Sequence, residues 1–193
     1  MSLYVVPVTA RHARQLGPHL READAIECQT LTGLDSTSAL LKAIEVSTEV
    51  FTAMSGSTPV GMFGHRDMGD GVGVIWMLGS PKMTADLRDF LGASSEWWER
   101  ITSRYDVCVN RVWEGNRLHA SWLAWMGCRF ADVTQLEGDP PRPFRNFHYV
   151  RTSNDLTGAL RRGRCRDNRG DSSGGESGQG DRDNQQQAVQ LDR

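Results

Sequence analysis

The segment that most constrains this chain is 106–130, which has the pattern of a strand, a tight turn, an amphipathic helix and a second strand. Side chains over 107–112 alternate with the period of two that is typical of a strand. Gly115 marks the turn, and Asn116 suits a helix N-cap because its side-chain oxygen can accept an unpaired amide. Apolar residues then recur at helical spacing: Leu118, Trp122, Trp125 and Met126. Gly127 ends the predicted helix.

The remainder of the chain supplies further strands and helices around this unit. We expect, in chain order, a strand over 3–9, helices over 10–16, 19–32 and 37–46, and antiparallel strands over 49–54, 58–66 and 72–78. A helix broken near Gly92 is then predicted to run to Tyr105. After the 106–130 unit, Thr134–Pro143 is predicted as a loop and Phe144–Arg151 as the last strand. This order predicts an α+β fold.

The length and composition predict one domain followed by a tail. The 193 residues are enough for a single domain with a sizeable core, which we place at 1–152. Over 153–193 the residues Gly, Ser, Arg, Asp and Gln dominate, so this segment is predicted to be disordered. The basic cluster Arg161–Arg166 within it fits either a nucleic-acid contact or a solvated linker, and composition favours the linker.

Charge and cysteine usage exclude several classes of protein. A formal net charge of −2 argues against an electrostatically driven nucleic-acid binder. The four cysteines are far apart and form no C-x-x-C pair, so we predict buried thiols and no metal site. No basic-then-apolar leader and no membrane-spanning stretch is apparent in the sequence. We therefore expect a soluble protein made in a reducing compartment.

Several motifs carry a resemblance to known families. The 106–130 unit is similar to the last strand–helix–strand unit of the GNAT (Gcn5-related N-acetyltransferase) fold. More narrowly, the chain resembles the small internal virion proteins of short-tailed, autographivirus-type phages, which carry that fold. The motifs are Arg21-x-x-Asp24-x-x-Glu27, Ile75-Trp76-Met77-Leu78, Phe90-Leu91 with Ser94-Ser95, and Asn110-x-Val112 with Asn116. The resemblance covers residues 4–151.

The GNAT resemblance implies a site for the pyrophosphate of acetyl-coenzyme A after the third meander strand. Members of the family bind it with successive backbone amides in an Arg/Gln-x-x-Gly-x-Gly/Ala loop at a helix N-terminus. Here the corresponding stretch begins at Leu78 and contains one glycine, Gly79. Pro81 removes an amide donor. Lys82 could contact a phosphate as a point charge, although an exposed turn lysine is the better explanation.

The resemblance also implies a general acid and a general base. The family's acid is a tyrosine four residues before the glycine that ends the last helix, and here that position is Leu123, which cannot donate a proton. His119 is the nearest ionisable ring. The candidates for the base are Glu27, Asp24 and His65, although a lone histidine on a strand is more often half-exposed. Because Leu123 stands at the position of the acid, no residue is assigned to that role.

The remaining polar residues have two interpretations. Arg21, Asp24 and Glu27 lie at spacings of three on one predicted helix, and they form either a solvated helix face or, as the phage resemblance implies, part of a cleft or partner site with Trp76. Asn110 either lines a cleft between splayed central strands or holds the turn at Gly115. Asn116 is explained as a helix cap, and in GNAT enzymes an asparagine here also contacts coenzyme A.

Two functions from different classes follow from these features. The first is a non-enzymatic phage internal virion or core-associated protein that acts in particle assembly or genome ejection. It would need no cofactor, would bind other virion or assembly proteins, could form a homodimer, and would be found in the host cytoplasm and the virion interior. The second is an acetyl-coenzyme A-dependent N-acetyltransferase. A catalytically inactive domain that still binds coenzyme A lies between them.

Overall fold

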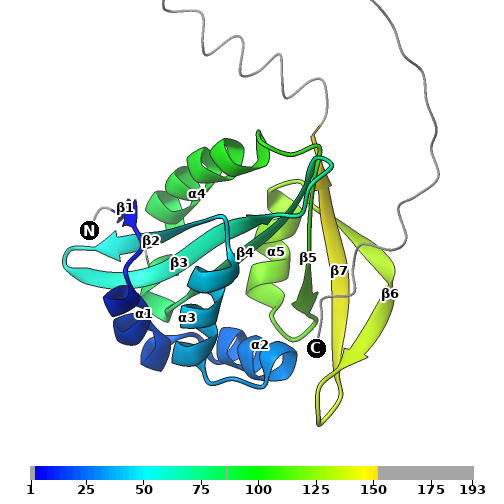
Figure 1. Cartoon of the computed structure of the whole chain (residues 1–193), viewed down its shortest axis with the longest axis horizontal. Coiled ribbons are helices and arrows are strands. Elements are labelled where there is room, and N and C mark those ends of the chain that lie inside the picture. Colours follow the sequence, from blue (N-terminus) through cyan, green and yellow to red (C-terminus); the bar gives the residue numbers. More distant parts are fainter. Residues whose placement is uncertain (1–2, 86, 152–193) are drawn as a thin grey trace, which may run out of the picture. The chain divides into compact units, whose positions relative to one another are not determined.

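The computed structural model describes residues 3–85 and 87–151, and it contains a seven-stranded sheet in the order β1-β2-β3-β4-β5-β7-β6. The strands are β1 Leu3–Pro7, β2 Glu49–Ser55, β3 Thr58–Asp67, β4 Val72–Gly79, β5 Val107–Trp113, β6 Arg129–Glu137 and β7 Arg142–Val150. The helices are α1 Ala10–Leu16, α2 Glu22–Thr32, α3 Ser36–Val46, α4 Leu87–Thr102 and α5 Arg117–Trp125, with short 3-10 turns at Gly17–His19 and Pro81–Thr84. The architecture is α+β, as predicted (Figure 1).

Helices cover both faces of the sheet. On one face α1 and α3 pack against strand side chains that include Val50, Met62 and Trp76, and α2 lies beside α3. On the other face α4 and α5 pack over a core that contains Ile75 and Phe147. Burial of these apolar faces on the two sides is the main contribution that holds the layers together.

The central strands β4 and β5 run parallel and pair over a short distance only. Their paired positions are Val72 with Val107, Gly73 with Cys108, and Val74 with Val109. All other neighbouring strands pair antiparallel. Immediately beyond the last pair, the Asn110 Nδ2 donates to the Ile75 carbonyl at 2.7 Å. The two strands therefore separate toward their carboxyl ends, and Asn110 lies where the separation begins (Figure 1).

Local signals explain most of the helix boundaries. Thr9 accepts the His12 amide, Asp35 accepts the amides of Thr37 and Ser38, and Asn116 accepts the His119 amide. The N-cap role predicted for Asn116 is thus confirmed. Gly33, with φ +70°, ends α2 in the left-handed region that favours glycine.

Three predicted boundaries are wrong. The predicted helix over 19–32 begins only at Glu22, because a 3-10 turn that contains Pro18 precedes it. No break occurs near Gly92: α4 continues through it, since one glycine costs a helix only about 1 kcal/mol and Phe90 and Ile101 on this helix are buried. The predicted loop Thr134–Pro143 contains the end of β6.

The β6 error has a physical cause. Residues 134–137 pair with Arg142–Arg145 of β7, so backbone hydrogen bonds define the strand. Val133 and Leu136 of this edge strand are 70% and 69% exposed, so its apolar side chains do not mark a buried face. Burial alternation, on which the strand prediction rests, is therefore missing here.

Some predictions fall outside the described residues, including the disordered tail 153–193, its basic cluster Arg161–Arg166, and Cys165. The other three cysteines, Cys28, Cys108 and Cys128, are buried free thiols, as predicted. Among the helices of residues 3–85 and 87–151, none combines the length and the apolar character needed to cross a membrane.

Candidate functional site

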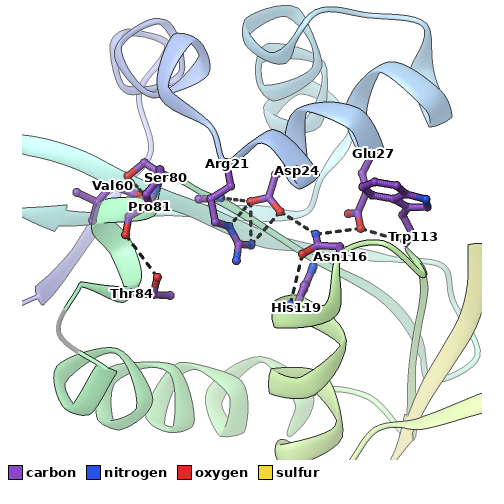
Figure 2. A network of polar contacts seen from close by, with 11 residues as sticks. Arg21, Asp24, Glu27, Val60, Ser80, Pro81, Thr84, Trp113, Asn116 and His119 are labelled. Atoms are coloured by element: carbon purple, nitrogen blue, oxygen red, sulfur yellow. Dashed lines mark hydrogen bonds and ion pairs between the residues drawn. The ribbon is translucent and has the colours of Figure 1, made fainter.

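The candidate site lies where β4 and β5 have separated, and helix α2 joins their two ends. Figure 2 shows Arg21, Asp24 and Glu27 directed from α2 toward the start of α5. The Gly79 amide of β4 donates to Asp24 Oδ2 at 2.8 Å, and the Trp113 amide of β5 donates to Glu27 Oε1 at 3.0 Å. Because the strands no longer pair here, these amides need other acceptors, and the α2 carboxylates supply them.

Asn116 connects the two carboxylates. Its Nδ2 donates to Asp24 Oδ1 at 2.9 Å and to Glu27 Oε1 at 3.0 Å, while its Oδ1 accepts the His119 amide at 3.4 Å (Figure 2). Arg21 binds Asp24 through two nitrogens, Nε to Oδ2 at 3.0 Å and Nη2 to Oδ1 at 2.8 Å. This two-point geometry is the strongest arrangement of such a pair. The acceptor capacity of Asp24 is thus fully used.

The network is buried, which excludes the solvated helix face as its explanation. Asp24 is 0% exposed, Asn116 2%, Glu27 7% and His119 8%. Buried charges persist in proteins only when they are paired and hydrogen-bonded. Here Arg21 neutralises Asp24, and Glu27 has no cationic partner of its own among the described ion pairs.

The environment changes the protonation of two groups. Burial, together with the negative charge of Asp24, raises the pKa of Glu27 to about 7, against the opposing hydrogen bonds from Asn116 and the Trp113 amide. Burial lowers the pKa of His119 to about 4, so its imidazole is neutral at pH 7. A carboxylate that titrates near neutral pH can take up and release a proton there, which is what a general base requires.

A cavity of about 240 Å³ adjoins this network. Its lining includes Ile75 and Trp76 of β4, Asn110 of β5, side chains of α2 and α3 from one face, and side chains of α4 and α5 from the other. The cavity therefore reaches both faces through the gap between the separated strands. Glu27 and His119 both lie on its wall.

Several amides of the loop after β4 are used within the protein. Gly79 donates to Asp24, Ser80 to the Val60 carbonyl at 2.8 Å, and Met83 to the Ser80 carbonyl at 3.0 Å. Pro81 has no amide to offer. A Cβ at Gly79 would lie 2.5 Å from the Met83 Cε, so the flexible end of the Met83 side chain would have to move. The amides of Gly79, Ser80 and Met83 are therefore not free to bind the pyrophosphate of coenzyme A.

The other predicted site residues are distributed over several places. Asn110 and Trp76 lie on the cavity wall, and the Trp76 Nε1 donates to Ser47 Oγ at 3.0 Å. Leu78 also lines the cavity, whereas Lys82 is exposed in the loop. His65 is 0% exposed and lies outside the cavity lining, with its Nδ1 2.6 Å from the Tyr105 hydroxyl. The expectation of a half-exposed histidine is therefore wrong.

Three of the site's side chains also have the spacing of a metal site. One ligand atom each from Asp24, Glu27 and His119 lies within 4.8 Å of the others. However, both Asp24 oxygens already accept hydrogen bonds from Arg21, Asn116 and the Gly79 amide. A divalent cation would have to displace the Arg21 guanidinium. The donor set therefore does not fit a metal ion.

Sequence reasoning missed one member of the site, the Trp113 amide, and expected Gly79 to bind a cofactor, whereas its amide donates to Asp24. Amides carry no sequence signal of their own. The indirect signal was the pair of carboxylates in Arg21-x-x-Asp24-x-x-Glu27, which exceeds what the single arginine can neutralise.

Comparison with known proteins relates this arrangement to solved structures. A probable GNAT-family acetyltransferase from Chromobacterium violaceum superposes with a TM-score of 0.58 at 18% identity, over 78% of this chain and 88% of that one. An acetyltransferase from Bacillus subtilis in complex with CoA gives 0.51 at 11% identity, over 78% and 99%. Ard1 from Thermoplasma volcanium gives 0.58 at 8% identity, over 79% and 100%. The chain has the GNAT fold.

The comparisons extend no further than the fold. No protein-family model matches the sequence, and no curated protein matches it either. The identities to the solved GNAT structures are too low to transfer an activity. The comparisons also give no support to the narrower resemblance to phage internal virion proteins.

Proposed function

We propose that this chain is a GNAT-fold N-acyltransferase that takes an acyl thioester in the cavity between β4 and β5 and passes the acyl group to an amine. One observation carries the proposal: a carboxylate, Glu27, lies on the wall of a cavity that reaches through the sheet. The amine enters from the α2 side and the thioester from the opposite face. A reaction between two substrates needs such a meeting point.

In this reaction the amine nitrogen attacks the thioester carbonyl, the C–N bond forms and the C–S bond breaks. An amine that binds as an ammonium group loses two protons. Glu27 accepts the first, which frees the nitrogen lone pair for attack, and the second passes through water to the leaving thiolate, because Leu123 occupies the position of the family's acid. Cys28, which also lines the cavity, does not serve as a nucleophile, since burial raises the pKa of its thiol to about 12.

The closed loop at Gly79–Ala85 supports a specific expectation about the thioester. Since the amides of Gly79, Ser80 and Met83 are already bonded, we infer that the diphosphate of coenzyme A adds little to binding. We expect acetyl-pantetheine, which lacks the nucleotide, to react with a KM similar to that of acetyl-coenzyme A.

The test is an acyl-transfer assay of the full chain with both thioesters and a panel of amines. Glu27→Gln retains an oxygen for the Trp113 amide but removes the base, so we expect its kcat to fall about 10²- to 10⁴-fold. Glu49→Gln, which changes a carboxylate outside the cavity, is the matched control and keeps activity. Absence of turnover with every amine contradicts the proposal.

A second candidate function is the non-enzymatic one, a phage internal virion or core-associated protein. Two observations favour it: Leu123 is 1% exposed and packed in the core, so nothing there titrates, and the Gly79 amide is held by Asp24. Exposed Val133 and Leu136 on the edge strand β6 offer an apolar surface for other assembly proteins or a second copy. This candidate predicts no thioester turnover, and association that Leu136→Lys abolishes in light scattering or pull-down with virion proteins.

A further inference from the structure

The cavity wall has a composition that selects among amines. Its aromatic members include Phe63, Trp76, Phe90, Trp97, Trp98, Trp122 and Phe147. The volume of about 240 Å³ exceeds that of the roughly 150 Å³ apolar cavity that is known to hold a benzene ring. The space is therefore large enough for a six-membered ring together with a short acyl group.

Most polar side chains on the wall already have a hydrogen-bond partner, and two buried ring nitrogens, Trp98 Nε1 and His119 Nδ1, have none in the part of the chain that the structure describes. Thr32 donates to the Cys28 carbonyl at 2.6 Å, Ser94 to the Leu91 carbonyl at 3.2 Å, and Thr102 to the Trp98 carbonyl at 2.9 Å. Asn110 donates to Ile75. A ligand with several polar groups would find few partners here, and each buried polar group without a partner is unfavourable.

Glu27 differs from the other polar residues of the wall in its charge type. Among the described residues that line the cavity it carries the only carboxylate. Both of its described hydrogen bonds use Oε1, which leaves Oε2 as an acceptor for a ligand. Arg111, the cation of the wall, is paired with Glu137 at 2.5 Å, and His119 is neutral at pH 7. The wall thus offers one carboxyl group, which titrates near neutral pH, in an apolar, aromatic surrounding.

We propose that the acceptor of this site is a monoamine with an apolar body of about the size of an aromatic ring, held by its ammonium group on Glu27. This inference rests on the proposed function. A polyamine would place a second ammonium group away from any carboxylate of the wall, and a peptide amine would bring unpaired backbone amides into it. Neither matches the wall as well as a single charge on an apolar group.

The aromatic rings contribute to the recognition of the charge. The Trp122 ring lies 5.8 Å from the His119 ring, and His119 in turn has a ring nitrogen within 4.8 Å of a Glu27 oxygen. Glu27, His119 and Trp122 all line the cavity, so an ammonium group on Glu27 shares this space with indole rings, whose faces attract cations. Neutral His119 adds no repulsion.

Binding of three probes to the full chain tests this inference without any thioester. We expect 2-phenylethylamine to bind saturably in calorimetry, its neutral analogue 2-phenylethanol to bind at least tenfold more weakly, and spermidine not to bind. Glu27→Gln should weaken the amine at least tenfold and leave the alcohol unchanged. Glu49→Gln, the matched control, should alter neither.

A second variant tests the same cavity if Glu27→Gln fails to fold. Ala93 lines the cavity on α4, so Ala93→Phe should fill the space and weaken the amine and the alcohol alike. Tighter binding of spermidine than of 2-phenylethylamine, equal binding of amine and alcohol, or unchanged binding in Glu27→Gln would each overturn the inference.

The two proposals fail in different ways. If 2-phenylethylamine binds through Glu27 but no acyl group is transferred to it from acetyl-pantetheine or acetyl-coenzyme A, the amine site stands and the acyltransferase proposal falls. If acyl transfer occurs to spermidine and not to 2-phenylethylamine, the acyltransferase proposal stands and the monoamine assignment falls.

Discussion

The two ends of the β4–β5 pair satisfy their backbone hydrogen bonds with different groups. At the closed end the strands pair directly, and a polar cluster beside them bonds within itself: His65 Nδ1 lies 2.6 Å from the Tyr105 hydroxyl, and Arg104 pairs with Glu49 at 2.9 Å. At the open end the amides of Gly79 and Trp113 bond to side chains of α2. The first cluster supports a sheet that is already complete, whereas the second replaces hydrogen bonds that the sheet lacks.

This difference predicts that the open-end network matters more for stability than its charges alone suggest. Asp24→Ala would leave Arg21 buried without a partner and the Gly79 amide without an acceptor. We expect a loss of about 3–5 kcal/mol in the free energy of unfolding, measured by urea denaturation at pH 7. A loss below about 1 kcal/mol would mean that the network is dispensable for the strand ends.

The protonation of Glu27 should make the stability of the open end depend on pH. The folded pKa of about 7 lies above the ordinary value of 4.5, so the folded state holds the proton more tightly and Glu27 favours folding at low pH. This contribution is complete below pH 4.5 and is lost as pH rises through 7. Glu27→Gln has no such titrating group. As the pH rises from 4.5 to above 7, its free energy of unfolding should therefore increase by about 3 kcal/mol relative to that of the native chain.

His119 has the opposite effect on the pH dependence of stability, but it is present in both Glu27→Gln and the native chain. The lowered pKa of His119 makes its contribution present above pH 6.5 and lost as pH falls through 4. Denaturation curves at four pH values between 4.5 and 8 measure the difference. If the difference between Glu27→Gln and the native chain does not change with pH, the assignment of a raised Glu27 pKa is contradicted.

A smaller effect is expected at the closed end. Tyr105→Phe removes the hydroxyl that bonds to His65 but retains the ring that packs over Gly73. Because one buried hydrogen bond is lost while the strand pairing remains, we expect about 1–2 kcal/mol of destabilisation. A loss as large as that of Asp24→Ala would contradict the contrast between the two ends.

The smallest effect is expected on the surface. Lys42 and Glu45 form an ion pair at 3.1 Å on α3, with side chains that are 53% and 69% exposed. Lys42→Ala should change the free energy of unfolding by less than about 1 kcal/mol, and less still at high salt. This variant is the matched reference for the buried pair of Arg21 and Asp24, since both pairs have the same spacing on a helix.

The sequence was informative where local rules decide the structure. The period of 107–112, the cap at Asn116 and the turn glycines predicted the central strand–helix–strand unit, because each depends on residues a few positions apart. The edge strand β6 was partly missed, since backbone pairing without burial leaves no apolar alternation. The site was found only as candidates: side-chain type marked Asp24 and Glu27, but their backbone partners depend on where β4 and β5 separate.

The hydrogen bonds of the site connect distant parts of the chain. Asp24 reaches Gly79 across 55 positions, Glu27 reaches Trp113 across 86, and Asn116 reaches Asp24 across 92. Contacts of such separation form late in folding, after local helices and hairpins. During synthesis, Asp24 and Glu27 of α2 emerge long before Asn116, so their hydrogen bonds to its amide can form only later. Completion of this network therefore marks the point at which the early and late parts of the domain have joined, and a nascent chain that ends before Asn116 cannot reach it.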